Sequence, residues 1–341
     1  MRAGAAGRRR MSSAATETAQ EHAVLRQAAE WFAVLYADDA SAAEREAWQR
    51  WLDAAPEHQL AWQKIEAVNQ QFGMLPSEPA LAALKTPHTR RSAAKKILLL
   101  ATTVALGAAV SRRDSREYMA ALAAGERTAV GEMRQLALAD GSDLWMNTDS
   151  ALDIDFAAGL RRVALHRGEI LLHSGHDPVR PARPLVVDLL GGRLTALGTR
   201  FSVFRSGAAA RLAVFEGSVR IDLDAGHSLT AAAGTQMHFG ADWIGAAEAA
   251  DEQQSAWTRK RLSVDGMRLG DFVATLARYR RGHLGCNPAV ADLLLTGSYP
   301  LDDLDRILAA LEKSLPVRVH RVMPWWVTVE PAGMAPAGRA T

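Results

Sequence analysis

The chain has 341 residues, enough for two or three domains, and 48% of them are apolar, which is ordinary for folded protein. Forty Lys and Arg against 38 Asp and Glu leave it near neutral, so overall charge gives no argument for binding nucleic acid or an acidic ligand. The one cysteine, Cys286, excludes an intrachain disulfide and cannot form a thiolate metal site alone, so we expect it to be a buried apolar residue.

The N-terminal residues 1–18 are basic at Arg8, Arg9 and Arg10 but have no apolar stretch behind them. They therefore do not resemble a cleavable signal peptide, and we expect a disordered tail. Residues 19–75 differ, because apolar side chains recur at helical spacing between Glu21 and Phe72 and predict a domain of three helices.

Local signals mark the ends of these helices. Ser41 and Glu44 form a capping box that starts the second helix, Pro56 suits the first turn of the third, and Gly73 stands where a C-terminal cap is expected. A three-helix unit could also be a DNA-binding helix-turn-helix, but residues 49–72 carry only two fixed positive charges, which are few for phosphate contacts.

Four of the nine tryptophans lie between Trp31 and Trp62. In so small a domain they predict an aromatic core, and any exposed tryptophan would be a strong anchor for a partner protein.

Residues 76–92 are a Pro-containing, basic linker, and Ile97 to Val110 after it is apolar and uncharged. Fourteen helical residues rise only about 21 Å, less than the bilayer core, but a helix over 93–111 rises about 28 Å if the flanking lysines reach the headgroups. We interpret residues 93–111 as one membrane-spanning helix; a buried helix is the alternative. The basic flanks are Arg90, Arg91, Lys95, Lys96, Arg112 and Arg113.

The basic run from Thr89 to Lys96 also resembles a twin-arginine export signal, which leaves the export route open. Basic residues lie on both sides of the apolar stretch, so their distribution does not decide the orientation of the chain in the membrane.

Residues 112–248 form a β-rich domain by their pattern, because short runs of alternating apolar and polar residues are separated by glycine turns. No repeat of fixed period is present, which favours packed antiparallel sheets over a solenoid. Residues 258–331 return to mixed α+β structure, with expected helices near 269–279 and 301–315 and strands near 261–264, 293–298, 317–320 and 326–329. The tail, 332–341, is rich in Gly, Ala and Pro and carries no expected structure.

The sequence gives little support for a catalytic site or a metal site. His173 and His176 have no third ligand at a suitable spacing, and Phe215-Glu216-Gly217-Ser218 is not a nucleophile elbow. We expect no enzyme activity, no metal and no cofactor.

Three separate blocks resemble the FecR-type sigma-factor regulators. In the helical region the block runs from Trp51-Leu52 to Pro56, His58 and Ala61-Trp62. In the C-terminal region it comprises Trp257, Leu262, Arg278-Tyr279 and Thr296-Gly297-Ser298-Tyr299, similar to a short α+β domain of secretins and TonB-dependent receptors. The motif residues in the β-rich region are Asp140, Gly141, Gly168, Glu169, Gly198, Thr199, Phe201, Glu216 and Gly217.

The resemblance implies a single-pass inner-membrane protein with a cytoplasmic N-terminus and a periplasmic C-terminus. Its helices would bind a sigma factor of the extracytoplasmic-function class, and its periplasmic part would contact the signalling domain of a TonB-dependent outer-membrane transporter in iron-siderophore regulation. Envelope proteases would cleave it in signalling, and it would not bind nucleic acid directly. The sigma-binding candidates are Trp31, Trp48, Trp51, His58 and Trp62, and the transporter-docking candidates are Leu294, Thr296, Gly297 and Tyr299.

Two features depart from the family pattern: the apolar stretch is short for a membrane-spanning helix, and the segment Gly282 to Cys286 is richer in glycine than expected where a strand should run. Two other readings of the chain remain open. One is an envelope-anchored, β-rich binding protein whose helices oligomerise, and the other is a cytosolic DNA-binding regulator in which the apolar stretch is a buried helix.

Overall fold

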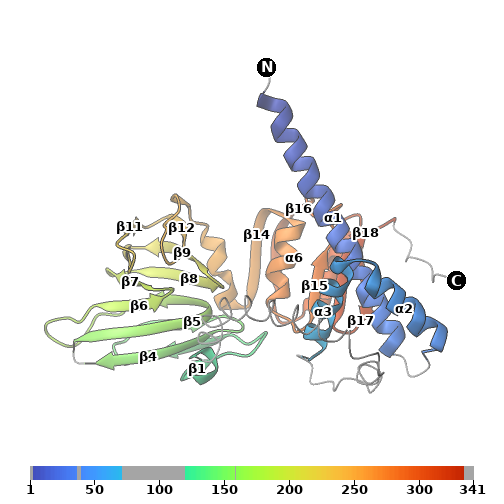
Figure 1. The fold of residues 1–341 in the computed structure, drawn as a ribbon. Coiled ribbons are helices and arrows are strands. Elements are labelled where there is room, and N and C mark those ends of the chain that lie inside the picture. The colour runs from blue at the N-terminus through green and yellow to red at the C-terminus, as the bar shows by residue number, and fades with distance from the viewer. Residues whose placement is uncertain (1–2, 37–39, 71–119, 158, 334–341) are drawn as a thin grey trace, which may run out of the picture. The chain divides into compact units, whose positions relative to one another are not determined.

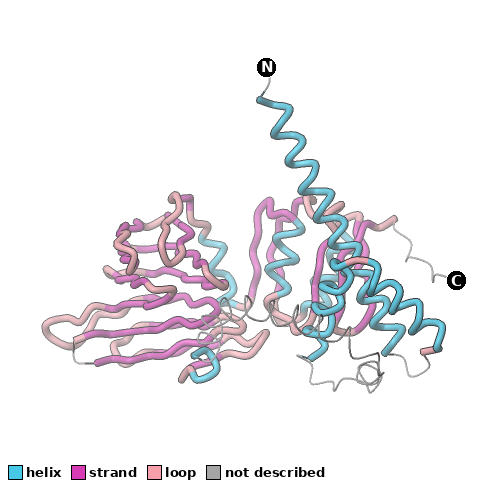
Figure 2. Tube along the Cα trace, viewed as in Figure 1, coloured by secondary structure: helices cyan, strands magenta, loops and turns pink. Residues whose placement is uncertain are grey.

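The computed structural model describes residues 3–36, 40–70, 120–157 and 159–333. These residues fall into two compact units. One contains the N-terminal helices and most of the C-terminal α+β elements, and the other contains a large sheet structure (Figure 1). Helices dominate the N-terminal segment, whereas strands dominate the β-rich segment (Figure 2).

Three helices form the helical domain: α1 (Ala3–Tyr36), α2 (Ala42–Ala54) and α3 (Pro56–Gln70). The capping box at the start of α2 is confirmed, since Ser41 Oγ accepts from the backbone N–H of Glu44 while the Glu44 side chain accepts from the backbone N–H of Ser41. Pro56 is the first residue of α3, as its fixed φ and missing N–H favour. Gly73 lies outside the described residues.

Helix α1 begins at Ala3, although the sequence suggests a disordered tail over residues 1–18. The reason is local: the segment contains no proline and is rich in alanine, the residue with the highest helix propensity. The expectation of three helices in the domain is met, and only the start of the first differs.

The β-domain comprises strands β1 to β13, followed by the 3₁₀ helix η1 (Glu252–Arg259). Its strands are β1 (Glu126–Arg127), β2 (Arg134–Ala137), β3 (Asp143–Met146), β4 (Ala151–Ala157), β5 (Leu160–His173), β6 (Leu185–Leu189), β7 (Gly192–Ala196), β8 (Arg200–Ser206), β9 (Ala209–Glu216), β10 (Ser218–Leu223), β11 (Ser228–Ala232), β12 (Thr235–Phe239) and β13 (Glu248–Ala249).

Strand β5 organises this domain because both of its halves pair on two sides. Its first half pairs with β4 and, in parallel, with β6, while its second half pairs with β3 and β8. The strand order along the sheet is β11-β10-β7-β6-β5-β8-β9-β12-β13. Along this order β5 and β6 are parallel, and the other strand pairs are antiparallel. The expected antiparallel sheet architecture is therefore found, with one parallel pair.

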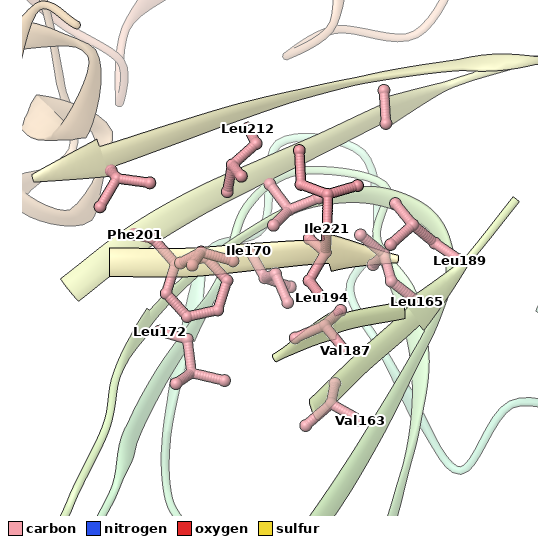
Figure 3. Packing of buried hydrophobic residues seen from close by; sticks show 14 of the residues in the cluster. Val163, Leu165, Ile170, Leu172, Val187, Leu189, Leu194, Phe201, Leu212 and Ile221 are labelled. Atoms are coloured by element: carbon pink, nitrogen blue, oxygen red, sulfur yellow. The ribbon is translucent and has the colours of Figure 1, made fainter. Parts of the chain in front are cut away.

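One apolar core serves the whole β-domain. Ile170, Leu172, Phe201 and Leu212 from the second half of β5, β8 and β9 lie in the same cluster as Val163, Val187, Leu194 and Ile221 from the first half of β5, β6, β7 and β10 (Figure 3). Removing such side chains from water stabilises a domain by about 25 cal/mol for each Å² of apolar surface. The shared strand thus holds both halves of the sheet around a common core.

The C-terminal module contains two helices and five strands: β14 (Arg261–Arg268), α6 (Leu269–Ala277), β15 (His283–Cys286), β16 (Leu294–Pro300), α7 (Leu304–Ser314), β17 (Val317–Met323) and β18 (Trp326–Pro331). Strands β14 and β16 form a two-stranded sheet, and β15, β18 and β17 form a three-stranded sheet in that order. The helices bury Phe272, Leu276, Leu308 and Leu311.

In the glycine-rich segment Gly282 to Cys286, residues His283–Cys286 do form a strand, β15, parallel to β18, and Gly282 directly precedes it. Its glycine content reflects close packing: a Cβ on Gly282, whose φ is +92°, would lie 2.3 Å from the carbonyl oxygen of Trp325. Glycine is needed where another backbone approaches this closely. Cys286, on the same strand, is half-buried, and burial, followed by the charge of Glu330, raises its pKa to about 12.

Candidate functional site

A run of aromatic rings crosses the helical domain. Trp48 of α2 lies 5.0 Å from Trp62 of α3, Trp62 lies 5.6 Å from Phe32 of α1, and Phe32 stacks on Tyr36 at 5.3 Å, measured between ring centroids. Of these, Phe32 is buried, Trp48 and Trp62 are half-buried and Tyr36 is exposed. The aromatic cluster is therefore partly buried in the domain and partly exposed at its surface. Exposed aromatic side chains held in this way are suited to contact a partner protein.

The turn between α2 and α3 is fixed by a second aromatic pair. The rings of Trp51 and His58 are parallel within 6° with centroids 4.5 Å apart, and His58 Nδ1 lies 2.6 Å from the carbonyl oxygen of Trp51. The Trp and the His of the sequence block, Trp51 and His58, thus meet in space. Trp31 is half-buried on α1.

Helix α1 also lies against the C-terminal module within the same unit. His22 Nε2 lies 3.1 Å from Glu330 Oε1, and the rings of Phe32 and Trp325 meet edge to face at 5.6 Å. Leu25 and Ala29, between His22 and Phe32 on the same helical face, belong to the cluster that includes Trp325 and Trp326.

The transporter-docking candidates lie on or beside β16. Leu294 is 64% exposed although it lies in a strand, and Thr296 Oγ1 accepts from the Gly266 N–H. Tyr299 is half-buried, and burial raises the pKa of its hydroxyl. Among the described residues β16 pairs only with β14, so its other edge is an edge of the sheet, the place where a further strand can be added.

The motif residues of the β-domain are mainly structural. Gly141 has φ +78° in the turn after Asp140, and Gly168 has φ +89°. A Cβ on Gly168 would lie 2.5 Å from Ser150 Cα, so that position excludes every side chain. The same holds for Gly217, where a Cβ would lie 2.1 Å from the carbonyl oxygen of Gly198.

Glu169 is buried at 2% exposure and receives polar contacts from several strands. Asn147 Nδ2 donates to its carboxylate at 2.8 Å, Ser202 Oγ lies 3.5 Å away, and Arg211 Nη2 lies 3.6 Å away. Because a buried carboxylate must be paired, these contacts tie β5 to β8 and β9.

Phe201 is buried in the core, and the backbone N–H of Thr199 donates to Ser174 Oγ at 2.7 Å. Arg200 follows and pairs with Glu216 at 2.8 Å and with Glu252 at 2.5 Å, and its guanidinium lies 4.8 Å from the Phe215 ring centroid. These pairs connect β8 to β9 and to the start of η1.

A buried ion-pair network not anticipated from the sequence joins the loop after β5 to the sheet. Arg161 Nη1 donates to Asp140 Oδ2 at 2.5 Å, and its Nε lies 3.9 Å from Asp177 Oδ2. Asp177 pairs again with Arg183, which donates at 2.9 Å. Asp140 belongs to a family motif, but its charged partner Arg161 lies 21 residues away, where no local pattern connects the two.

Both buried carboxylates are held ionised. Hydrogen bonding from Arg183 is the chief reason that the pKa of Asp177 lies well below its usual value. Burial raises the pKa of Asp140, but hydrogen bonds from Ser142 and Arg161 outweigh it, and the pKa is lowered.

These pKa directions predict acid sensitivity of the β-domain. A carboxyl whose folded-state pKa is depressed contributes stability that is complete above its unfolded pKa, about 3.9, and is lost as the pH falls toward the folded value. We expect the urea midpoint of the β-domain to decline below about pH 4. An Asp177→Asn variant should decline less steeply, and an equal slope in the two proteins would contradict this role.

The remaining expectations about sites concern the membrane and metals. The basic flanks Arg90, Arg91, Lys95, Lys96, Arg112 and Arg113 lie outside the described residues, as does the apolar stretch between them. Within the described segments, no helix is both long and apolar enough to span a bilayer, and no group of His, Cys, Asp and Glu is arranged to hold a metal ion.

Comparison with known proteins gives two family matches. Residues 125–220 match the model "FecR protein", and residues 26–68 match the model "Domain of unknown function (DUF4880)". The second match spans all five sigma-binding candidates. No curated protein matches the chain.

Two crystal structures of a candidate anti-sigma factor from Parabacteroides distasonis ATCC 8503 also resemble the chain at 18% identity, each covering 60% of it. One, at 1.65 Å resolution, is covered over 98% of its length with a TM-score of 0.50, and the other over 97% with a TM-score of 0.49. At this identity the first likeness is one of fold.

Proposed function

Because this chain belongs to the FecR family, we propose that it is an anti-sigma factor whose helical domain binds a sigma factor of the extracytoplasmic-function class. The observation that carries the proposal is the presence in one chain of the FecR match and of the separate match at residues 26–68. The role is regulatory and needs no catalytic residue or cofactor.

The half-buried aromatic residues give this binding a physical basis. Trp48, Trp51 and Trp62 each keep part of the side chain accessible while the rest is fixed by neighbouring rings. A rigid, partly exposed tryptophan loses little conformational entropy on binding, which is why such residues dominate the energetics of protein interfaces.

Trp51→Ala is expected to weaken binding of the cognate sigma factor by about 2 kcal/mol, roughly thirtyfold, because it removes both the indole and the surface that positions His58. The measurement is co-purification of the sigma factor with the full chain, together with transcription from a promoter that depends on this sigma factor. Trp51→Phe keeps a ring against His58 and should retain most of the binding.

Trp243→Ala serves as the matched control, since Trp243 is 45% exposed on the β-domain and lies outside the helical domain. Unchanged sigma binding by Trp51→Ala, with helical content unchanged by circular dichroism, would remove Trp51 from the interface. Absence of sigma binding by the unaltered chain would overturn the anti-sigma function itself.

The localisation we propose is the bacterial inner membrane, crossed once at residues 93–111, with the helical domain in the cytoplasm and the β-domain in the periplasm. The uncharged run from Ile97 to Val110 supports the crossing itself, and the orientation follows the family resemblance. A signal from a TonB-dependent transporter, in the setting of iron-siderophore uptake, would then pass inward across one helix, and envelope proteases would release the cytoplasmic part.

We propose that the free edge of β16 is the part of the C-terminal module that meets the transporter's signalling domain. An unpaired edge accepts an added strand through backbone hydrogen bonds, with neighbouring side chains providing specificity. Leu294, with 64% of its side chain exposed in a strand, supplies an apolar contact at this edge.

Leu294→Lys should abolish transporter-dependent induction while leaving the thermal unfolding of the chain within about 0.5 kcal/mol, because an exposed side chain contributes little to folding. Pull-down of the purified signalling domain by the full chain measures the effect. Leu229→Lys, at another exposed leucine on the β-domain edge strand β11, is the control. If both variants bind equally well, the β16 edge is not the docking site.

A further inference from the structure

A tryptophan is exposed on the β-domain, in the loop that follows β12 (Figure 1). Trp243 is 45% exposed and lies between Gly240 and Gly245. The Gly240 N–H donates to the carbonyl oxygen of Trp243 at 3.0 Å. Phe239 and Ile244 form an antiparallel bridge within the same loop. Backbone hydrogen bonds therefore fix the position of this tryptophan.

The indole is held against the loop because two glycines leave room for it. A Cβ on Gly240 would lie 2.3 Å from Trp243 Nε1, and a Cβ on Gly245 would lie 3.5 Å from Trp243 Cζ3. Part of the ring thus packs on the backbone while the rest faces solvent. A ring that is already fixed loses little conformational entropy when a ligand binds to it.

The exposed part of Trp243 borders a hollow of about 380 Å³. His227 and Ser228, at the start of β11, and Asp242, beside the tryptophan, line it with polar groups. Ligand pockets in proteins have volumes of about 300–1,000 Å³ and combine apolar walls with a few polar groups. The hollow is at the small end of this range, so its size favours a small molecule over a protein segment.

The charge around the hollow is negative. Asp242 is the one lining residue with a fixed charge, and within the described segments its carboxylate has no hydrogen bond and no ion pair. Residues 221–251 contain five Asp and Glu and no Lys or Arg. One of the five, Asp222, accepts from Ser228 Oγ and is paired with Arg220, at 2.7 Å in each case. A cation is therefore the ligand that this charge distribution favours.

An indole beside a carboxylate favours one kind of cation, a guanidinium group. Cations are attracted to the face of a tryptophan ring, and a planar guanidinium also stacks on aromatic rings. Its N–H groups donate to a carboxylate through parallel hydrogen bonds. A quaternary ammonium group has no N–H to donate to Asp242, and a ligand with its own carboxylate would be repelled by Asp242.

We propose that the hollow bordered by Trp243 and Asp242 binds a small guanidinium compound without a carboxylate, with the cation over the indole and its N–H groups donating to Asp242. The site shares no residue with the sigma-binding helices or with the edge of β16. It gives the β-domain a ligand-binding role of its own, independent of the anti-sigma function.

The test is binding of butylguanidine to the full chain in a maltoside detergent, measured by saturation-transfer NMR. Butylurea is the matched probe, because it has nearly the same shape but no charge. The variants Asp242→Asn and Trp243→Ala change the site, and Asp155→Asn, at an exposed carboxylate of β4, is the control variant. Thermal unfolding checks the fold of each variant.

Butylguanidine is expected to bind the unaltered chain and the Asp155→Asn variant equally well. We expect Trp243→Ala and Asp242→Asn each to weaken this binding about fivefold, through loss of the cation–π contact and of an exposed charged hydrogen bond. Butylurea is expected to bind more weakly than butylguanidine. Equal binding of the two probes by the unaltered chain would overturn the proposal without reference to any variant.

Other results would overturn it in distinguishable ways. Unchanged binding of butylguanidine by both site variants would place the ligand elsewhere on the chain. Tighter binding of tetramethylammonium would assign the hollow to another class of cation, and tighter binding of a blocked glycyl-arginyl-glycine tripeptide would make it part of a protein interface. Absence of saturation transfer to butylguanidine would leave the hollow without a ligand of this class. Each of these results leaves the anti-sigma function intact.

Discussion

Replacing Arg161 by methionine is expected to destabilise the β-domain by about 3–5 kcal/mol, the usual cost of removing one partner from a buried ion pair. Arg161 is buried at 7% exposure and donates to Asp140, while its Nε approaches Asp177. Methionine has a similar length but no charge, so both carboxylates lose a cation and the space stays filled. Urea unfolding of the full chain, followed by fluorescence of the β-domain tryptophans, measures the loss.

Arg193→Met is the matched control. Arg193 pairs with Asp188 through two bonds of 2.7 and 2.9 Å, but its side chain is 46% exposed, so solvent screens the pair and the expected change is below about 1 kcal/mol. Equal losses in the two variants would show that the network around Arg161 is no more important than a surface pair.

The sequence predicted features that depend on neighbouring residues, but not the buried ion pairs of Arg161, whose partners are far away in the chain. Turn and cap positions depend on neighbours a few residues apart, so Ser41, Glu44, Pro56 and Gly141 were readable from their local pattern. The partners of Arg161 come from the β2–β3 turn and from the loop after β5, and only the folded sheet brings them together.

At strand β15 the local sequence pattern argued against the structure that is found. Its glycines argue against a strand when only propensity is considered, because glycine has no side chain to pack. In the fold, Gly282 is needed where the backbone of Trp325 passes. The same reasoning applies to the long strand β5, whose pairing on both halves depends on contacts between residues far apart in the chain.

Only part of the candidate site could be predicted from the sequence. The Trp51–His58 stack joins residues of one short motif, so the motif pointed to the right pair. The packing of α1 against Trp325 and Trp326 was not predicted, because Leu25 and Ala29 are ordinary helix residues and only the fold brings the aromatic turn to them.

The proposed membrane topology and the contacts of α1 with the C-terminal module make opposite demands on the chain. The contacts of His22 with Glu330 and of Phe32 with Trp325 require the N-terminal helix and the C-terminal module to share one compartment. A membrane crossing at residues 93–111 requires them to be apart. One molecule cannot satisfy both conditions at once, so a measurement of topology decides which arrangement the mature protein has.

Paired reporter fusions are expected to give cytoplasmic activity after Pro79 and periplasmic activity after Gly245. The reason is the free energy of membrane insertion of the uncharged segment Ile97 to Val110, in which each leucine, isoleucine and valine favours the bilayer core by about 0.3–0.6 kcal/mol. The basic residues at both ends lie at the headgroups. Cytoplasmic activity at both positions would make this segment a buried helix, remove the transporter from the mechanism and agree with the contact between Phe32 and Trp325.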